Sequence, residues 1–117
     1  MSTYNFRVEF MEDVKTFLDG IDGKSREKII YNIWKARSTN DKELFKKLQD
    51  EIWEFRTKYK KTYYRLFAFW DKSQKDDTVV ISTHGMIKKT EKIPKKEIER
   101  AKRLRQEYFK NRSDENI

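Results

Sequence analysis

The sequence predicts an α+β protein built on a small antiparallel sheet, in which an N-terminal strand joins a three-stranded meander. Three strand-like segments follow one another between residues 52 and 83, and their short polar connections are typical of antiparallel strands. Segments with helical periodicity lie before and after them. We therefore expect N-terminal helices packed on the sheet and one helix at the C-terminal end.

The N-terminal half begins with a strand and continues with helices. Tyr4, Phe6 and Val8 alternate with polar residues, which predicts a short strand. Apolar residues at helical spacing then predict helices over residues 10–21 and 29–37.

Two details of the helical region can be tested directly. Trp34 falls on the side of the second helix that we expect to be buried. Leu44, Phe45 and Leu48 predict a third, short helix, which the polar residues 38–41 can cap.

The meander occupies the C-terminal half. Its first strand begins at Ile52 and ends in a turn over residues 58–61, which lacks the usual glycine. The second strand covers residues 62–70, is rich in aromatic residues, and is expected to be covered on both faces. The third covers residues 78–83, and Pro94 then fits the first turn of a helix.

Length and charge set the class of protein. With 117 residues the chain is long enough for one modest core, so we expect one domain over residues 1–112 and a frayed tail over 113–117. The formal net charge is +8, and residues 51–112 carry 18 basic against 9 acidic side chains. A basic field in one half of a chain favours a polyanionic partner such as nucleic acid, the ribosome or an anionic membrane, although a solvated lysine-rich surface has the same composition.

Composition also excludes some chemistry. The chain has no cysteine and one histidine, so disulfides and thiolate chemistry are excluded and a catalytic zinc site lacks its usual ligands. No apolar stretch has the length of a membrane span and the N-terminus lacks a signal-peptide core, so we expect a cytoplasmic protein without membrane contact. No cluster of acidic residues accompanies the basic half, so any cleavage of nucleic acid is expected to run without a metal.

Arg65 is the candidate that stands out, because it lies within the most hydrophobic strand. One interpretation is an ion pair with Glu54 on the adjacent strand, or a stack on an aromatic ring. The other is a guanidinium that faces a phosphate-binding groove. Arg56 on the neighbouring strand, with Lys88 and Lys89 at the end of the third strand, then completes an anion site.

His84 is the second candidate. Its unperturbed pKa near neutrality suits a general acid or base, and a hydrogen-bonded histidine at the end of a strand is an equally good interpretation. Tyr63, Tyr64 and Trp70 have rings that can stack on nucleic-acid bases, although core packing is the commoner role.

The second half, over roughly residues 52–110, resembles the RelE/ParE superfamily of toxin–antitoxin toxins, in particular its HigB-like, phage-derived branch. Four separate pieces in the same order and spacing carry the resemblance. They are Glu54-Phe55-Arg56, Tyr64-Arg65-Leu66-Phe67, His84-Gly85-Met86-Ile87-Lys88-Lys89-Thr90, and Pro94 with Glu97-Ile98 and Ala101.

The resemblance implies a RelE-like toxin that enters the ribosomal A site and cuts mRNA without a metal or other cofactor. The RNA 2′-hydroxyl attacks the adjacent phosphate and leaves a 5′-hydroxyl end. It implies further that a cognate antitoxin, of helix-turn-helix type, neutralises a monomeric toxin by forming a larger assembly. The implied catalytic residues are Arg65, Lys88, Lys89 and His84, and the implied RNA-phosphate ligands are Arg56, Lys92 and Lys61.

The chain departs from that pattern at two places. Ile93 stands where HigB-like relatives usually have a threonine that caps the helix, and the glycine expected before the Tyr64-Arg65 pair is absent. Two functions of other classes also stay open. One is a ParE-like toxin that inhibits DNA gyrase by binding, and the other is a basic nucleic-acid-binding domain without activity.

Overall fold

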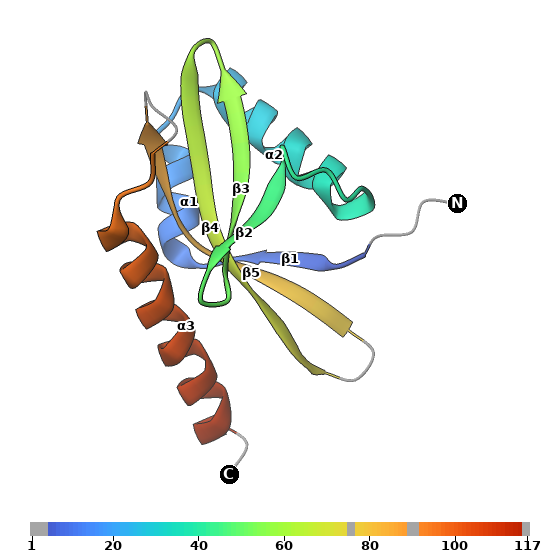
Figure 1. Cartoon of the computed structure of the whole chain (residues 1–117), viewed down its shortest axis with the longest axis vertical. Coiled ribbons are helices and arrows are strands. Elements are labelled where there is room, and N and C mark those ends of the chain that lie inside the picture. The colour runs from blue at the N-terminus through green and yellow to red at the C-terminus, as the bar shows by residue number, and fades with distance from the viewer. Residues whose placement is uncertain (1–4, 75–76, 89–91, 116–117) are drawn as a thin grey trace.

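The computed structural model describes residues 5–74, 77–88 and 92–115, and within them the chain forms five strands and three helices (Figure 1). In chain order these are β1 (Arg7–Phe10), α1 (Glu12–Asp19), α2 (Gly23–Ser38), β2 (Phe45–Gln49), β3 (Ile52–Tyr59), β4 (Thr62–Gln74), β5 (Asp77–Lys88) and α3 (Lys95–Glu115). The α+β class is confirmed. Tyr4 and Lys89, which the sequence singled out, lie outside the described residues.

The sheet is mixed rather than antiparallel. Its strand order is β1-β5-β4-β3-β2, and the four later strands are antiparallel neighbours. β1 adds to the far edge beside β5 and runs parallel to it, with Arg7 opposite Val79. The prediction of an all-antiparallel sheet is wrong at this strand, because no hairpin links β1 to β5 and alternation alone carries no information on direction.

β2 replaces the third helix that the sequence predicted. Phe45 lies opposite Phe55 on β3, and its ring stacks on those of Phe55 and Trp53. Leu48 packs in the apolar cluster on the other face of the sheet. The predicted helix was too short to be stable alone, so strand pairing and ring stacking decided the conformation.

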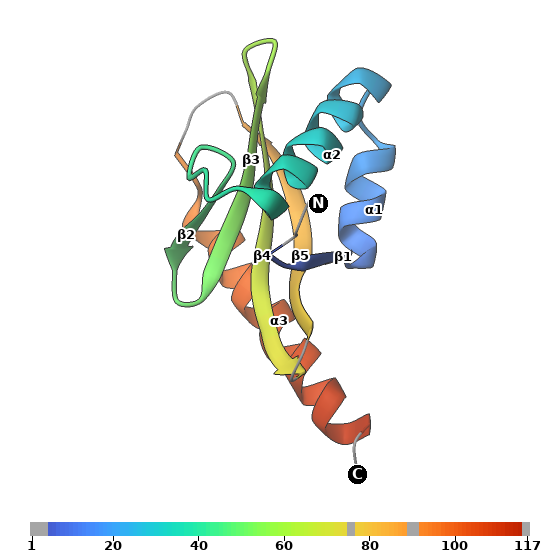
Figure 2. The same cartoon turned by 90° about the vertical axis from the view of Figure 1, so that its right-hand side faces the viewer.

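Helices cover both faces of the sheet (Figure 2). α1 and α2 pack on one face, over a core that includes Val14, Leu18, Ile29 and Ile33. α3 packs on the other face, where its buried Ile98 and Ala101 meet β-strand residues such as Phe67 and Phe69, as predicted for these two helical positions. The structure therefore has three layers, and the basic C-terminal half supplies most of two of them.

α2 begins at a side-chain cap. Asp22 accepts a hydrogen bond from the backbone N–H of Ser25, and the Ser25 hydroxyl in turn accepts one from the buried Tyr64. These bonds tie the helix to β4. Trp34, which was expected to be buried, is 54% exposed, because Ile29, Ile33 and Ala36 already fill the side of α2 that faces the sheet.

β5 continues beyond the predicted end at Thr83 and reaches Lys88. Gly85 therefore lies within the strand and does not end it. A Cβ there would lie 2.5 Å from the ring of Phe17 on α1, so the glycine is required for close packing of α1 on the sheet.

α3 begins directly after Pro94, whose carbonyl accepts a hydrogen bond from Glu97 at 3.0 Å. Its backbone is helical to Glu115, three residues beyond the predicted end of the domain. Over the described residues no helix is long and apolar enough to span a membrane.

Candidate functional site

A β-bulge in β5 determines which face of the sheet carries His84. Phe67 pairs with His84, whereas the next residue, Ala68, pairs with Ser82, so Thr83 is an extra residue in β5. Without that extra residue, His84 would alternate onto the face of α1 and α2. The bulge turns its side chain toward α3, and bulges are a common means of re-aiming a side chain near functional sites.

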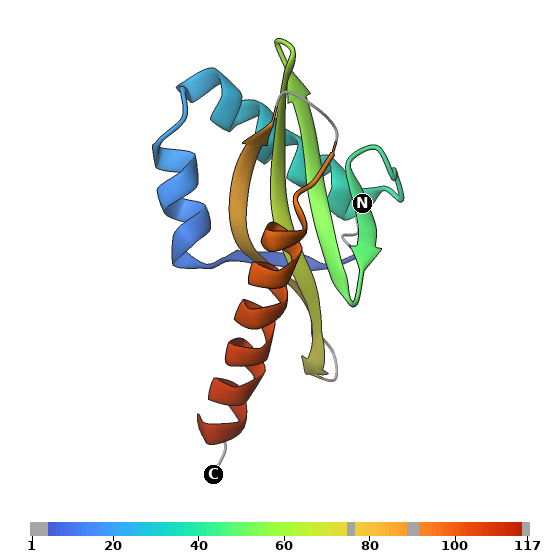
Figure 3. The same cartoon turned by 60° about the vertical axis from the view of Figure 1, so that its left-hand side comes forward.

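Three rows of cross-strand neighbours share this face. Figure 3 shows the strands of this region continuing beyond the N-terminal end of α3. Each row takes one residue from β3, one from β4 and one from β5, because directly opposite residues point to the same side of a sheet. We call these nine residues the arginine face. The rows are Lys58, Tyr63 and Lys88; Arg56, Arg65 and Met86; and Glu54, Phe67 and His84.

Arg56 and Arg65 lie directly opposite each other, with Glu54 beside both. Like charges in that position are unfavourable in a sheet. The Glu54 carboxylate offsets the repulsion, since its Oε1 lies 3.4 Å from Arg56 Nε and 3.7 Å from Arg65 Nη1. The side chain of Arg65 is 2% exposed and that of Arg56 is 16% exposed, so Arg56 forms the accessible part of the pair.

Glu54 is a buried carboxylate in this cluster. Burial raises the pKa of its carboxyl, and the charges of Arg65, Arg56 and Lys46 oppose that rise. Its Oε2 has no hydrogen-bond donor within the part of the chain that the structure describes. The ion pair that the sequence allowed between Arg65 and Glu54 is therefore present, with one carboxylate shared between two guanidinium groups.

The row formed by Lys58, Tyr63 and Lys88 places cations around an aromatic ring. Lys58 Nζ lies 5.3 Å from the centre of the Tyr63 ring, and the Arg65 guanidinium lies 5.5 Å from it. Lys88 is the neighbour of Tyr63 on β5 and is partly exposed. Tyr63 therefore holds cations by their attraction to its ring.

His84 lies in the row with Glu54 and Phe67, and it is 1% exposed. Its ring stacks on Phe67, and its Nδ1 lies 2.9 Å from Thr83 Oγ1. Burial, reinforced by Arg100, lowers its pKa to about 4, so the ring is neutral near pH 7. His84 is thus a buried residue inside the strand, and the prediction of a histidine at the end of a strand is wrong.

Two other predicted phosphate ligands are exposed residues of connecting segments. Lys61 is exposed in the turn between β3 and β4, and Lys92 is exposed just before α3. Sequence reasoning missed Lys58 as a member of the face, although Glu54, Arg56 and Lys58 alternate with period two. Lys46 was missed as well, because it lies in the segment that was predicted to be helical.

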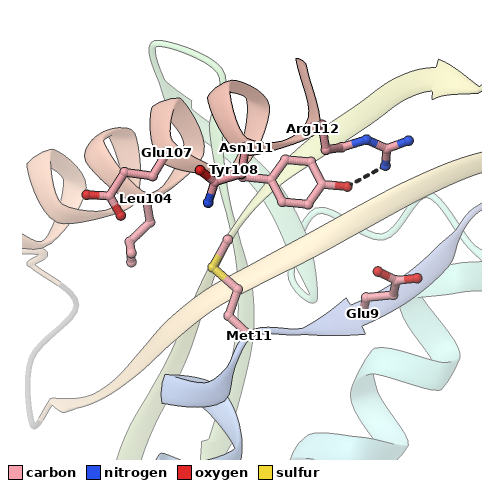
Figure 4. Close-up of a pocket in the computed structure, with 7 residues that line it drawn as sticks. All are labelled: Glu9, Met11, Leu104, Glu107, Tyr108, Asn111 and Arg112. Atoms are coloured by element: carbon pink, nitrogen blue, oxygen red, sulfur yellow. Dashed lines mark hydrogen bonds between the residues drawn. The ribbon is translucent and has the colours of Figure 1, made fainter. Parts of the chain in front are cut away.

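The described residues offer no group of three or more acidic, histidine or cysteine side chains that could hold a metal ion. A separate cavity of about 500 Å³ lies between Met11, beside β1, and the C-terminal half of α3. Figure 4 shows Tyr108 and Arg112 joined by a hydrogen bond at its wall. It contains none of the predicted site residues.

The fold and the arginine face define a small α+β protein with a cationic sheet surface. Residues 16–106 match the family described as phage derived protein Gp49-like (DUF891), and the chain belongs to that family. The family is associated with toxins of toxin–antitoxin systems. No curated protein matches the chain.

Proposed function

We propose that this protein is the toxin of a toxin–antitoxin system and an endoribonuclease that cleaves ribosome-bound mRNA without a metal. The main observation in support is the pair formed by Arg56 and Arg65. Two guanidinium groups lie opposite each other around the buried Glu54, and the exposed Glu43 is 4.0 Å from Arg56; a phosphate group is a natural ligand for such a pair. Membership of a family associated with toxins supports the same function.

The proposed reaction needs charge stabilisation more than covalent chemistry. The 2′-hydroxyl loses its proton and its oxygen bonds to the adjacent phosphorus. The bond from phosphorus to the 5′-oxygen then breaks, and that oxygen takes up a proton. The products are a 2′,3′-cyclic phosphate and a 5′-hydroxyl end. Excess negative charge develops on the phosphate oxygens in the transition state, where fixed cations act most strongly.

We assign roles on the arginine face from exposure. Arg56, the more accessible guanidinium, binds a phosphate oxygen directly, and Arg65 opposite it stabilises the transition state. Lys88 lies at the β5 side of the face, where it assists the leaving oxygen, and we propose that Lys89, Lys92 and Lys61 bind flanking phosphates. His84 is buried, so we assign it a positioning role beneath the arginines.

The test maps RNA 5′ ends by primer extension after a pulse of expression. Arg65→Ala is expected to reduce codon-phased cleavage by about 100-fold, and Arg56→Ala to weaken it as well. Because Arg65 is buried, circular dichroism checks that each variant folds. Arg103→Ala, at an exposed arginine on α3, is the matched control and is expected to cleave like the wild type.

Two results contradict the proposal. Folded Arg65→Ala and Arg56→Ala variants that cleave at the wild-type rate would remove the arginine pair from the mechanism. If translation continues while DNA breaks accumulate, the protein acts on gyrase and the nuclease function is wrong.

A further inference from the structure

A second surface feature lies on the opposite face of the sheet, beside the edge strand β2. It is a cavity of about 540 Å³ whose wall includes the rings of Phe6, Phe45, Trp53 and Trp70. Lys46 and Lys47 of β2 line the same cavity. We call it the Trp53–Trp70 hollow.

The rings of this hollow form an ordered stack. Phe55, Phe45 and Trp53 follow one another, with ring centres 4.4 Å and 4.8 Å apart and planes within 27° of parallel. Phe55 is buried, whereas Trp53 at the other end is partly exposed. Trp70 meets Trp53 edge to face at 5.5 Å. A flat aromatic ligand can therefore continue a stack that the protein has already built.

Trp70 adds a polar group. Its indole N–H is buried and has no acceptor among the residues that the structure describes. A buried donor without an acceptor costs free energy. The Nζ of Lys72 lies 5.2 Å from the centre of the Trp70 ring.

Cations outnumber carboxylates around these rings. A second cavity of about 550 Å³ shares Trp53, Trp70 and Lys47 with the first, and Lys72 and Arg105 line it. The carboxylates on the two linings are those of Asp41 and Glu51. Aromatic rings among cations are the composition of a surface that binds single-stranded nucleic acid.

Lys46 connects this hollow to the arginine face. It lines the hollow and lies directly opposite Glu54, which contacts both arginines. Lys46 therefore belongs to the edge of both surfaces, where the exposed carboxylate of Glu43 also lies 4.0 Å from Arg56 Nη1.

We infer that the Trp53–Trp70 hollow is a base-binding subsite for single-stranded RNA, in which one base stacks on Trp53 while Lys46 and Lys47 hold its phosphates. The inference rests on the proposed function, because it names a second contact of the same RNA. An acidic peptide shares the charge complementarity, but it does not continue a stack of rings or lead to the arginine face.

The test measures binding of a 2′-O-methyl oligoribonucleotide of about ten residues, which lacks the attacking hydroxyl and is not cleaved. The protein carries Trp34→Leu, so that Trp53 and Trp70 are the remaining tryptophans. We expect the RNA to quench their fluorescence. An oligomer with abasic sites is expected to quench less, because its phosphates remain and its bases are gone.

Two substitutions locate the subsite. Trp53→Leu is expected to weaken binding about tenfold, which is typical for the loss of one base stack. Lys47→Glu is expected to weaken binding severalfold as well. Because Lys47 is exposed, this substitution does not disturb the hydrophobic core. Lys110→Glu, an exposed residue on α3, makes the same charge change elsewhere and is the control.

The outcomes separate this inference from the proposed function. If codon-phased cleavage occurs but RNA causes no quenching and Lys47→Glu binds like Lys110→Glu, the subsite is wrong and the nuclease function stands. If quenching and both substitution effects occur without any cleavage in the cell, the subsite stands and the nuclease function fails. Quenching by an acidic, leucine-containing peptide but not by RNA would make the hollow a peptide site and overturn the inference.

Discussion

At the scale of single residues, burial changes the chemistry of the charged groups. Arg65 and Glu54 are both almost fully buried, in a position where an isolated charge is costly. His84 lies in the row next to that of Arg65 and stays neutral, because the cost of burying a charged imidazole outweighs the Glu97 carboxylate 3.8 Å from its Nε2. Of the four cations on the arginine face, Arg56, Lys58 and Lys88 are at least partly exposed, and the proposed role of Arg65 is exerted from the buried end of the pair.

We predict that His84 makes stability depend on pH. Its pKa is about 4 in the folded protein, below the usual 6.5, so between these values the unfolded chain binds a proton that the folded protein does not. The stabilisation that comes from keeping His84 neutral is therefore complete above pH 6.5 and is lost as pH falls toward 4. Over that range the free energy of unfolding decreases by about 3 kcal/mol. Urea unfolding from pH 4 to 7 measures it.

His84→Gln provides the comparison, because it removes the only histidine. The difference in unfolding free energy between wild type and variant isolates His84, since Glu54 is common to both. A difference that stays constant across this range would contradict the assignment of a depressed histidine pKa.

At the scale of elements, the β2–β3 and β3–β4 hairpins turn without glycine. Each has a two-residue loop with positive φ at both positions: 48° and 69° at Asp50 and Glu51, and 50° and 67° at Lys60 and Lys61. Turns of this kind strongly favour Asn-Gly, because other residues are strained there. The lysines in the β3–β4 turn therefore lower stability, and functional segments often carry such strain.

We predict that the pair of substitutions Lys60→Asn and Lys61→Gly stabilises the protein by about 1 kcal/mol, because it relieves that strain. If Lys61 binds an RNA phosphate, the same variant binds RNA more weakly. Urea unfolding and RNA binding measure the two effects.

The β2–β3 turn is the matched control. Asp50→Asn with Glu51→Gly makes the same change at the β2–β3 hairpin. It should stabilise the protein, less the small loss of exposed ion pairs to Lys102 and Lys47, and should not weaken RNA binding. A stabilised Lys60/Lys61 variant with unchanged RNA binding would rule out Lys61 as a ligand.

At the scale of the whole molecule, α3 packs on one face of the sheet and is held in both of its halves. In its first turns, Ile98 and Ala101 pack against the apolar residues of the sheet. Its C-terminal half is held by the buried Asp71 of β4. That carboxylate accepts hydrogen bonds from Tyr108 at 2.5 Å and Arg112 at 2.9 Å. Burial alone would raise the pKa of Asp71, but the hydrogen bonds from Ser73 and Tyr108 and the charge of Arg112 bring the pKa below its usual value.

We predict that Asp71→Asn lowers the unfolding free energy by about 2 kcal/mol and exposes the C-terminal half of α3, because it removes the charge that pairs with Arg112. Since the folded pKa is depressed, this stabilisation is present above pH 4 and is lost as pH falls further. Urea unfolding measures the loss, and amide hydrogen exchange locates it. Unchanged exchange in α3 would show that Asp71 does not hold the helix.

The local sequence pattern was sufficient to predict an element wherever a segment had a long periodic repeat of apolar residues or a clear capping or turn signal. The meander, α2 and the buried positions of α3 all follow from periods of two or about 3.6 residues, and these periods survive in the structure. The ion pair of Arg65 with Glu54 was one of the interpretations that the sequence allowed, because the two residues lie on adjacent strands of one hairpin.

The sequence by itself thus determined the α+β class, the hairpin that joins Arg56 to Arg65, and the basic charge of the second half. Only the tertiary structure decided the direction of β1, the strand conformation of β2, the side on which Trp34 lies and the burial of His84. The physical reason is the separation along the chain over which each effect acts. Propensity and period act over a few neighbouring residues, whereas pairing direction, bulges and burial depend on which distant segments come to lie together.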